Sequence, residues 1–134
     1  MTTVSKTIAF DAAHMLSGYS GKCRNLHGHT YRLEVDVRGE PDESGMVLDF
    51  FELKKCMSEA ADRFDHAFLY DERSETEREL ASFLEKRGLK TVSLPFRTTS
   101  ENLARHFFEL FRNRFAVSAV RVRETPTSCA EFKI

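Results

Sequence analysis

The segment 30–38 constrains the fold most, because it alternates strictly between apolar and polar residues. Its apolar members are Tyr31, Leu33, Val35 and Val37, and its polar members are Arg32, Glu34, Asp36 and Arg38. A period of two is that of a β-strand with one face in a core and the other in water. The segment therefore predicts a half-buried strand, and the run Gly39-Glu40-Pro41 predicts its end.

The remaining patterns predict the order β-β-α-(α)-α-β-β. Further strands are expected at 4–10, 117–123 and 130–134, and 91–96 reads as a loop or a minor strand. Helical spacing of apolar residues follows the candidate N-cap Asp49, with Glu52 placed for a capping box. The apolar stripe of this first helix is Leu53, Cys56, Met57, Ala60 and Phe64. A second, charged helix is expected over 74–87, with Leu80, Phe83 and Leu84 on one side and Gly88 as its C-cap. A last helix is expected from Ser100 or Glu101, with one side formed by Leu103, Phe107, Leu110, Phe111 and Arg114. This order predicts an α+β fold, an antiparallel sheet with helices on one face, whose open edges oligomerisation could pair.

Composition restricts the possible partners. The 134 residues are 41% hydrophobic and 31% charged, which predicts one globular domain over 1–134. A formal charge of −1 gives no general attraction to nucleic acid or to an anionic membrane, so an anionic substrate needs a local cluster of Lys and Arg. No apolar run reaches transmembrane length, and from the first residues we expect no signal peptide. Three cysteines do not suggest a disulfide framework, so we expect a protein of the reducing cytoplasm.

Three histidines on two strand-like segments are the main chemical signal. His27 and His29 are two residues apart and share a strand face, and His14 ends a segment in which Phe10, Ala12 and His14 also share a face. If the segments pair, three imidazole nitrogens can reach one ion and leave the fourth position of a tetrahedral zinc open. The alternative is ordinary, because His-x-His is common and most isolated histidines are surface or satisfied core residues.

Cys23 lies just before the histidine pair, in a polar loop between Lys22 and Arg24. Neighbouring cations and zinc would favour its reactive thiolate, as a nucleophile or a base, and the alternative is an ordinary exposed thiol. Cys56 falls on the first helix's apolar stripe and is expected to fill the core. Cys129 receives no role.

Two further positions carry chemistry. Asp65 beside His66 could orient an imidazole for proton transfer, although adjacent side chains often point apart and Asp65 could simply cap a helix. His106, at the edge of the last helix's apolar face, is expected to be structural.

Glu124 continues the inward face of Val120 and Val122. A carboxylate there needs donors. They could be two parallel N–H groups of a ligand such as a pterin edge, an Arg, or the following turn.

Together these residues resemble the 6-pyruvoyltetrahydropterin synthase/6-carboxytetrahydropterin synthase family. The matching motifs are FDAAHML, CRNLHGH, GMVLDFFELK, DHAFLY, TTSENLA and RETPTS. The resemblance implies that the zinc ligands are His14, His27 and His29. It implies that protons are transferred by Cys23, Asp65 and His66. It also implies that Glu124 is a catalytic residue and anchors the pterin, with Thr125 beside it. It implies the tunnelling fold, with trimeric barrels stacked into homohexamers and active sites between subunits.

The resemblance also implies a reaction. The three-residue gap between Cys23 and His27 is similar to the carboxy-forming branch, a zinc-dependent lyase. That enzyme converts 7,8-dihydroneopterin triphosphate to 6-carboxy-5,6,7,8-tetrahydropterin, acetaldehyde and triphosphate, in the biosynthesis of queuosine and other 7-deazapurines. Lys22 or Arg24 could meet phosphate. The alternatives are a pyruvoyl-forming synthase, which only eliminates triphosphate, and a non-catalytic relative that binds pterin or metal.

Two segments depart from the family pattern. Arg97-Thr98-Thr99 stands where the family usually has Asn-Pro-Thr, and the charged segment 72–90 is longer than in the shortest members. The first departure puts the local loop geometry in doubt. The second could alter substrate choice or simply cover the surface.

Overall fold

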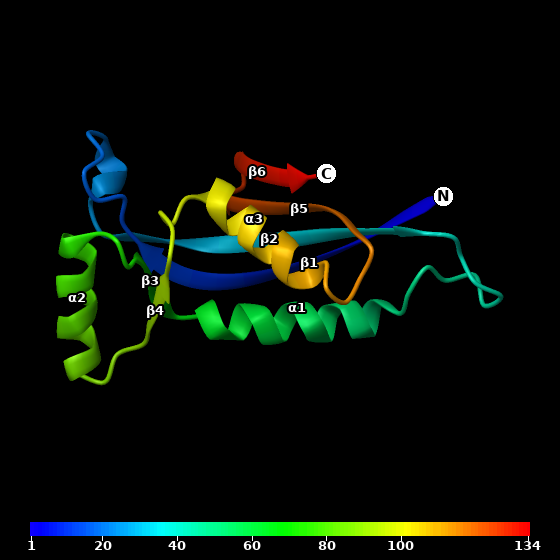
Figure 1. The fold of residues 1–134 in the computed structure, drawn as a ribbon, viewed down its shortest axis with the longest axis horizontal. Coiled ribbons are helices and arrows are strands. Elements are labelled where there is room, and N and C mark those ends of the chain that lie inside the picture. The colour runs from blue at the N-terminus through cyan, green and yellow to red at the C-terminus, as the bar shows by residue number, and fades with distance from the viewer.

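Two long antiparallel strands, β1 (Thr2–His14) and β2 (His27–Gly39), form the centre of the sheet in the computed structural model, which describes residues 1–134 (Figure 1). The other strands are β3 (Ala67–Asp71), β4 (Thr91–Leu94), β5 (Val117–Thr125) and β6 (Ser128–Lys133), and the order across the sheet is β4-β3-β1-β2-β5-β6. The strand predicted from the alternation over 30–38 is confirmed, and it reaches back to include both histidines of the pair.

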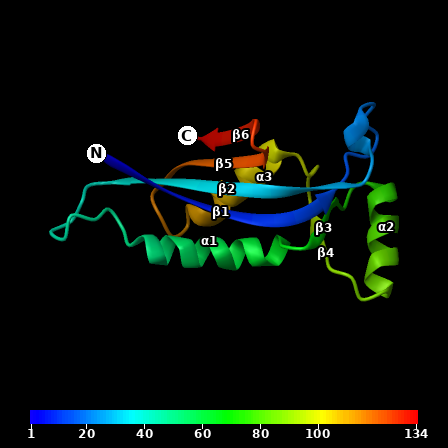
Figure 2. The same cartoon turned by 180° about the vertical axis from the view of Figure 1, so that it is seen from behind.

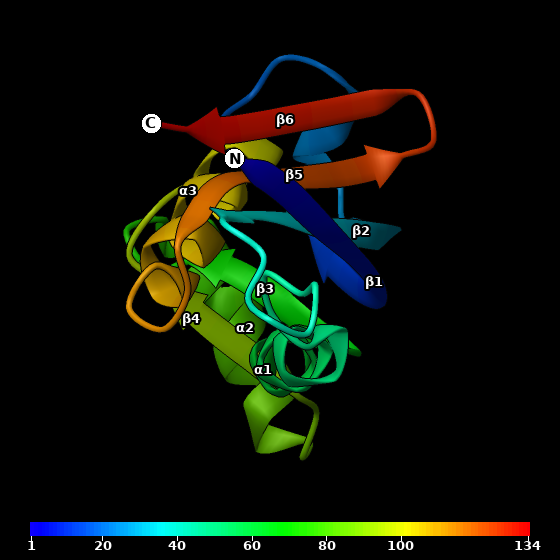
Figure 3. The same cartoon turned by 90° about the vertical axis from the view of Figure 1, so that its right-hand side faces the viewer.

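Three helices complete the fold: α1 (Phe50–Phe64), α2 (Glu75–Lys86) and α3 (Ser100–Phe111). Seen from behind, β1 and β2 lie in front of α3, and the view along the sheet shows the helices gathered on one side of it (Figures 2 and 3). The α+β class is therefore confirmed. The core lies between this side of the sheet and α1 and α3, and the alternating residues Tyr31, Leu33 and Val35 of β2 are fully buried in it. None of the helices combines the length and apolar character needed to cross a membrane.

The sheet is mixed, so the prediction of a wholly antiparallel sheet is wrong. β3 pairs in parallel with both β1 and β4, and only the β1–β2–β5–β6 part is antiparallel. The sequence did not predict β3. Its residues Ala67, Phe68, Leu69 and Asp71 are all buried, and a parallel strand covered on both faces shows no alternation. The 91–96 segment contains β4, so its reading as a minor strand is correct.

The helix boundaries follow the expected caps. The Asp49 side chain accepts the Phe51 N–H at 2.8 Å and begins α1, although Glu52 returns no bond to complete a capping box. α2 begins after Ser74 and is followed by Gly88, whose φ of +74° is the left-handed conformation that favours glycine.

The predicted apolar faces of α2 and α3 need correction. Leu110 is 45% exposed, whereas Ala104 and Phe108 are buried, because α3 leans toward β6 and Phe108 packs on Phe132 with ring centroids 5.0 Å apart. On α2 Phe83 is 53% exposed. This helix stands at one end of the molecule beside β3 and the loop after β1, and it buries Glu77 and Ala81 instead (Figure 1).

Candidate metal and active site

The register of β1 and β2 brings the three histidines together. His14 pairs directly with His27, and His29 pairs with Ala12 on the next inward position. The imidazole ring centroids are 4.7 to 5.1 Å apart, and one ligand atom from each ring lies within 4.8 Å of the other two. The pairing of these two strands, whose side chains alternate between the two faces, therefore directs three imidazoles toward one point at the end of the sheet.

The outer ring nitrogens fix how the imidazoles are turned. His14 Nδ1 lies 2.8 Å from the Thr98 carbonyl oxygen, and His27 Nδ1 lies 2.7 Å from the Asn25 carbonyl oxygen. A carbonyl only accepts, so each Nδ1 carries a hydrogen, and in the neutral form of the ring the lone pair is then on Nε2. The same arrangement orients histidines that bind metals.

The inner nitrogens lack hydrogen bonds. His14, His27 and His29 each bury an Nε2 atom that has no hydrogen-bond partner. The pKa of His14 is lowered to about 4, chiefly by burial; the hydrogen bond to Thr98 raises this pKa, and the nearby His27 and His29 lower it. His14 is therefore neutral at pH 7, the form that coordinates metal. Three imidazoles whose buried Nε2 atoms converge without hydrogen-bond partners fit a divalent metal ion, so the cluster could hold one.

Glu124, near the end of β5, faces this cluster. Its carboxylate oxygens lie 4.0 Å from His14 Nε2 and 3.8 Å from His29 Nε2. Neither ordinary alternative holds, since Glu124 forms no ion pair with an Arg, and Thr125 and Thr127 bond to each other across the following turn. Burial raises the pKa of Glu124, and so does the nearby charge of Glu101, with His27 acting the other way. The sequence placed this carboxylate correctly on the inward face.

Tyr31 is a site residue that sequence reasoning took only for core. Its side chain is fully buried, and its hydroxyl has no hydrogen-bond partner. Its ring packs edge-on against the His14 and His29 rings, with centroids 6.0 and 5.3 Å away. Burial raises the pKa of Tyr31, and the charge of Glu124 adds to this. The available signal was its position two residues after His29, on the same strand face.

Asp65 and His66 do point at each other. The Asp65 carboxylate lies 2.9 Å from His66 Nδ1 and accepts the Asp11 N–H at 2.9 Å. His66 has a φ of +60°, uncommon for a residue other than glycine, and this turn closes the pair. The Asp11 bond contributes most to lowering the pKa of Asp65, followed by the bond to His66. The side chain of Asp11, which alternates with the buried Ala12, brings a ligand atom within 4.8 Å of the pair.

The remaining predicted residues lie apart from this pair. Cys23 is exposed in the short 3₁₀ turn η1 (Lys22–Arg24), and its neighbours Lys22 and Arg24 are exposed as well. Thr125 is exposed at the end of β5, just before the turn to β6. Within one chain no hydrogen bond or ion pair joins Cys23 to His66, or either of them to the three histidines. His106 stacks on Phe64 and packs on Phe96, which agrees with a structural role.

The fold and the histidine cluster define a class, an α+β protein with three histidines at one end of its sheet that could hold a metal ion. Residues 3–134 match the model of the family described as 6-pyruvoyl tetrahydropterin synthase. The chain belongs to this family.

Relatives and solved structures agree with this assignment. A protein of Haemophilus influenzae named 6-carboxy-5,6,7,8-tetrahydropterin synthase is 44% identical over 140 residues, covering 99% of each chain. One of Aquifex aeolicus with the same name is 33% identical, covering 97% of this chain and 96% of the relative. The structure of Caenorhabditis elegans 6-pyruvoyl tetrahydropterin synthase superposes with a TM-score of 0.73 at 32% identity, covering 99% of this chain and 95% of that one.

Proposed function

We propose that the protein is a zinc-dependent lyase that forms 6-carboxy-5,6,7,8-tetrahydropterin from 7,8-dihydroneopterin triphosphate, releasing acetaldehyde and triphosphate. The observation that carries the proposal is the set of three buried, unpaired Nε2 atoms of His14, His27 and His29 beside Glu124. The name of the Haemophilus influenzae relative, 44% identical over its whole length, supports this reaction. A place in the supply of queuosine and other 7-deazapurines would follow from the product.

The three histidines would hold the zinc. When bound, the ion would act as a Lewis acid that makes the hydroxyl groups of the substrate side chain more acidic. The three-nitrogen donor set, with no fourth protein atom in the cluster, suits zinc in a catalytic rather than a structural site.

Each remaining residue would bind the substrate or move a proton. Both oxygens of Glu124 would accept parallel N–H groups of the pterin ring and fix its register, with Thr125 beside it at the turn. The thiolate of Cys23 would transfer protons on one face of the ring. His66, oriented by the 2.9 Å contact with Asp65, would serve the other step. The exposed Lys22 and Arg24 are available to the triphosphate.

A second copy of the chain would complete the site. No hydrogen bond or ion pair joins Cys23 to the Asp65–His66 pair in one chain, which favours an active site formed between subunits. β4 and β6 at the two ends of the sheet leave edges that can pair with other copies. The proposed assembly is a homohexamer made of two trimers.

The second candidate is the pyruvoyl-forming reaction, which the 32% identity to the Caenorhabditis elegans enzyme favours. The three-residue gap between Cys23 and His27 favours the carboxy-forming one. One product assay separates them. Zinc-loaded protein incubated with 7,8-dihydroneopterin triphosphate should release acetaldehyde together with triphosphate. Triphosphate without acetaldehyde would establish the second candidate, and bound pterin without any product would indicate a non-catalytic relative. Cys23→Ala protein serves as the control for uncatalysed breakdown of the substrate.

A further inference from the structure

A buried carboxylate lies outside the site described above. Glu77, in the first turn of α2, is 1% exposed and has no basic group within ion-pair distance. One of its oxygens accepts the Asp71 N–H at 3.1 Å, and the other accepts the hydroxyl of Ser17. A buried carboxylate is costly, and the helix N-terminus offsets only part of that cost. The loop residue Ser17 is therefore held by a buried carboxyl group that bonds to two segments at once.

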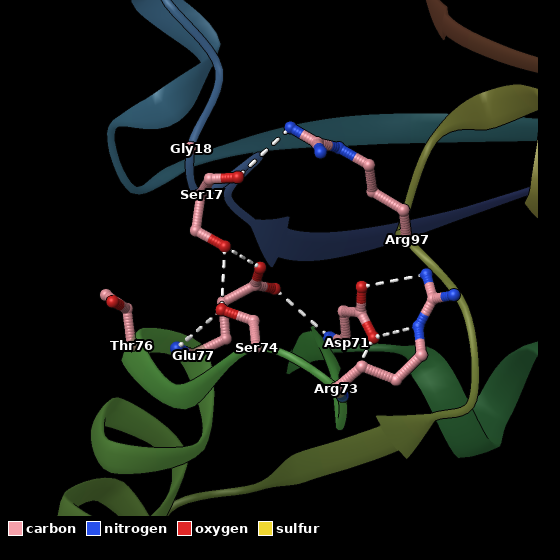
Figure 4. A pocket seen from close by; sticks show the side chains of 8 residues that line it. All are labelled: Ser17, Gly18, Asp71, Arg73, Ser74, Thr76, Glu77 and Arg97. Carbon is pink, nitrogen blue, oxygen red and sulfur yellow. Dashed lines mark hydrogen bonds and ion pairs between the residues drawn. The ribbon is translucent and has the colours of Figure 1, made fainter.

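A second residue holds Ser17 from the other side. Arg97 donates from Nη2 to the Ser17 carbonyl oxygen at 3.1 Å, and the Ser17 hydroxyl lies 2.7 Å from that of Ser74. Figure 4 shows Ser17 between Arg97 and Glu77, at the rim of a pocket of about 450 Å³ that has no apolar residue in its lining. Arg73 shares the lining but is paired with Asp71. Two guanidinium groups thus face two carboxylates, so the pocket is not an attractive site for an anion.

The residue beside Ser17 leads to Cys23. Leu16 donates its N–H to the Cys23 carbonyl oxygen at 2.9 Å, which closes the loop between β1 and β2. Thr98, the neighbour of Arg97, accepts from His14 Nδ1. The short segment 97–98 therefore contacts both the loop that carries Cys23 and a histidine of the metal cluster.

We propose that Glu77 and Arg97 are positioning residues, which fix Ser17 and through it hold the Cys23 loop in register with the three histidines. The two segments that depart from the family pattern, 72–90 and 97–99, would thus act together. Each contributes one partner to the same loop residue. This inference rests on the proposed role of Cys23 in proton transfer.

Amide hydrogen exchange tests the inference. Glu77→Met keeps the length of the side chain and removes both acceptors, Arg97→Met removes the donor, and Glu75→Met is the control because Glu75 is exposed and bonds to nothing. Exchange at the Leu16 N–H should become about tenfold faster in the first two variants, as expected for losing one charge-assisted hydrogen bond. The control should exchange at the wild-type rate.

Two further readouts separate positioning from a general loss of stability. Zinc content should stay at the wild-type level in Arg97→Met, while kcat falls about tenfold and KM changes little, since a displaced Cys23 affects proton transfer more than binding. Arg97→Lys, which keeps a donor, should recover part of kcat. Wild-type exchange at Leu16 in folded Arg97→Met and Glu77→Met would overturn the inference. If instead Cys23→Ala kept full turnover, the role of Cys23 would fail while the measured hold on the loop would stand.

Discussion

Two polar clusters lie on opposite faces of the sheet and differ in how their groups are satisfied. On the face away from the helices, the Arg121 guanidinium contacts three carboxylates: Glu34 at 2.7 Å, Asp36 at 2.9 Å and Glu131 at 2.8 Å. On the helix-covered face, the histidine cluster leaves three buried nitrogen atoms and the Tyr31 hydroxyl without partners. The groups of a satisfied network already have their partners, whereas several buried atoms without hydrogen-bond partners at one point suit the binding of a ligand.

The largest effect should come from Cys23, the residue proposed to transfer protons in the active site that includes the histidine cluster. Cys23→Ala should lower kcat by roughly a hundredfold to ten-thousandfold, the range that one proton-transfer group contributes. Zinc content and pterin binding should stay at the wild-type level, because the thiol is exposed in η1 and outside the histidine cluster. Loss of zinc together with activity would instead make Cys23 a ligand.

The next effect concerns Glu124. Glu124→Gln keeps the size of the side chain but turns one acceptor into a donor that faces a ring N–H. Pterin affinity should fall roughly tenfold to a hundredfold, or about 1.5–3 kcal/mol, the value of a charge-assisted contact. Calorimetric titration of the zinc-loaded variant measures this directly. Wild-type affinity would show that the ring is anchored elsewhere and that Glu124 only faces the histidines.

The satisfied cluster should respond in stability alone. Arg121→Met leaves the Asp36 carboxylate, 7% exposed, with only the Ser5 hydroxyl, and should lower the free energy of unfolding by about 2 kcal/mol in urea at pH 7. Zinc content and kcat should not change. A loss of zinc in folded Arg121→Met would mean that the two faces are coupled and would break the comparison.

The same cluster predicts a dependence on pH. Burial raises the pKa of Asp36, but the hydrogen bonds from Arg121 and Ser5 outweigh it, so the net shift is downward. A lowered pKa stabilises the folded state above the ordinary value of about 4, and this contribution is lost as the pH falls through the folded-state pKa. The difference in unfolding free energy between wild type and Asp36→Asn should therefore be largest near neutral pH and shrink below about pH 4. A difference that stayed constant down to pH 3 would exclude the linkage.

The smallest effect should come from Cys56. It is buried on α1, with its sulfur 3.6 Å from Arg114 Nη1, and Cys56→Ala removes one small core atom. Unfolding free energy should fall by about 1–2 kcal/mol, with no change in zinc content. A change in kcat at unchanged stability would assign the residue a role that its place in the core does not suggest.

The sequence predicted those parts of the fold and site that depend on local patterns. Alternation located β2 and placed His27 and His29 on one face of it, and the alternation of Val120 and Val122 on β5 placed Glu124 on the inward face, because a period of two fixes the direction of every side chain. It missed β3, whose buried run gives no period, and therefore the parallel half of the sheet. It also missed the partners that fold-level contacts supply, namely Thr98 on His14 and Glu77 on Ser17, because both pairs are far apart in the chain.

A second potential metal group makes the central claim sharper. Asp11, Asp65 and His66 also bring ligand atoms within 4.8 Å of one another. Asp11 accepts the Thr30 hydroxyl and Asp65 accepts the Asp11 N–H, and the side chain of His66 is 76% exposed. The groups there already have partners or water. Because its atoms are bonded or exposed to solvent, unlike the buried Nε2 atoms of the histidine cluster, this group should not bind zinc tightly.

Zinc content, measured by mass spectrometry on wild type, His29→Ala and His66→Ala after dialysis against a weak chelator, tests the central claim most directly. The three unpaired nitrogens predict one zinc per chain in wild type and in His66→Ala, and none in His29→Ala, while all three proteins remain folded by circular dichroism. Full zinc occupancy in folded His29→Ala, or its loss in His66→Ala, would contradict the assignment of the metal to the histidine cluster.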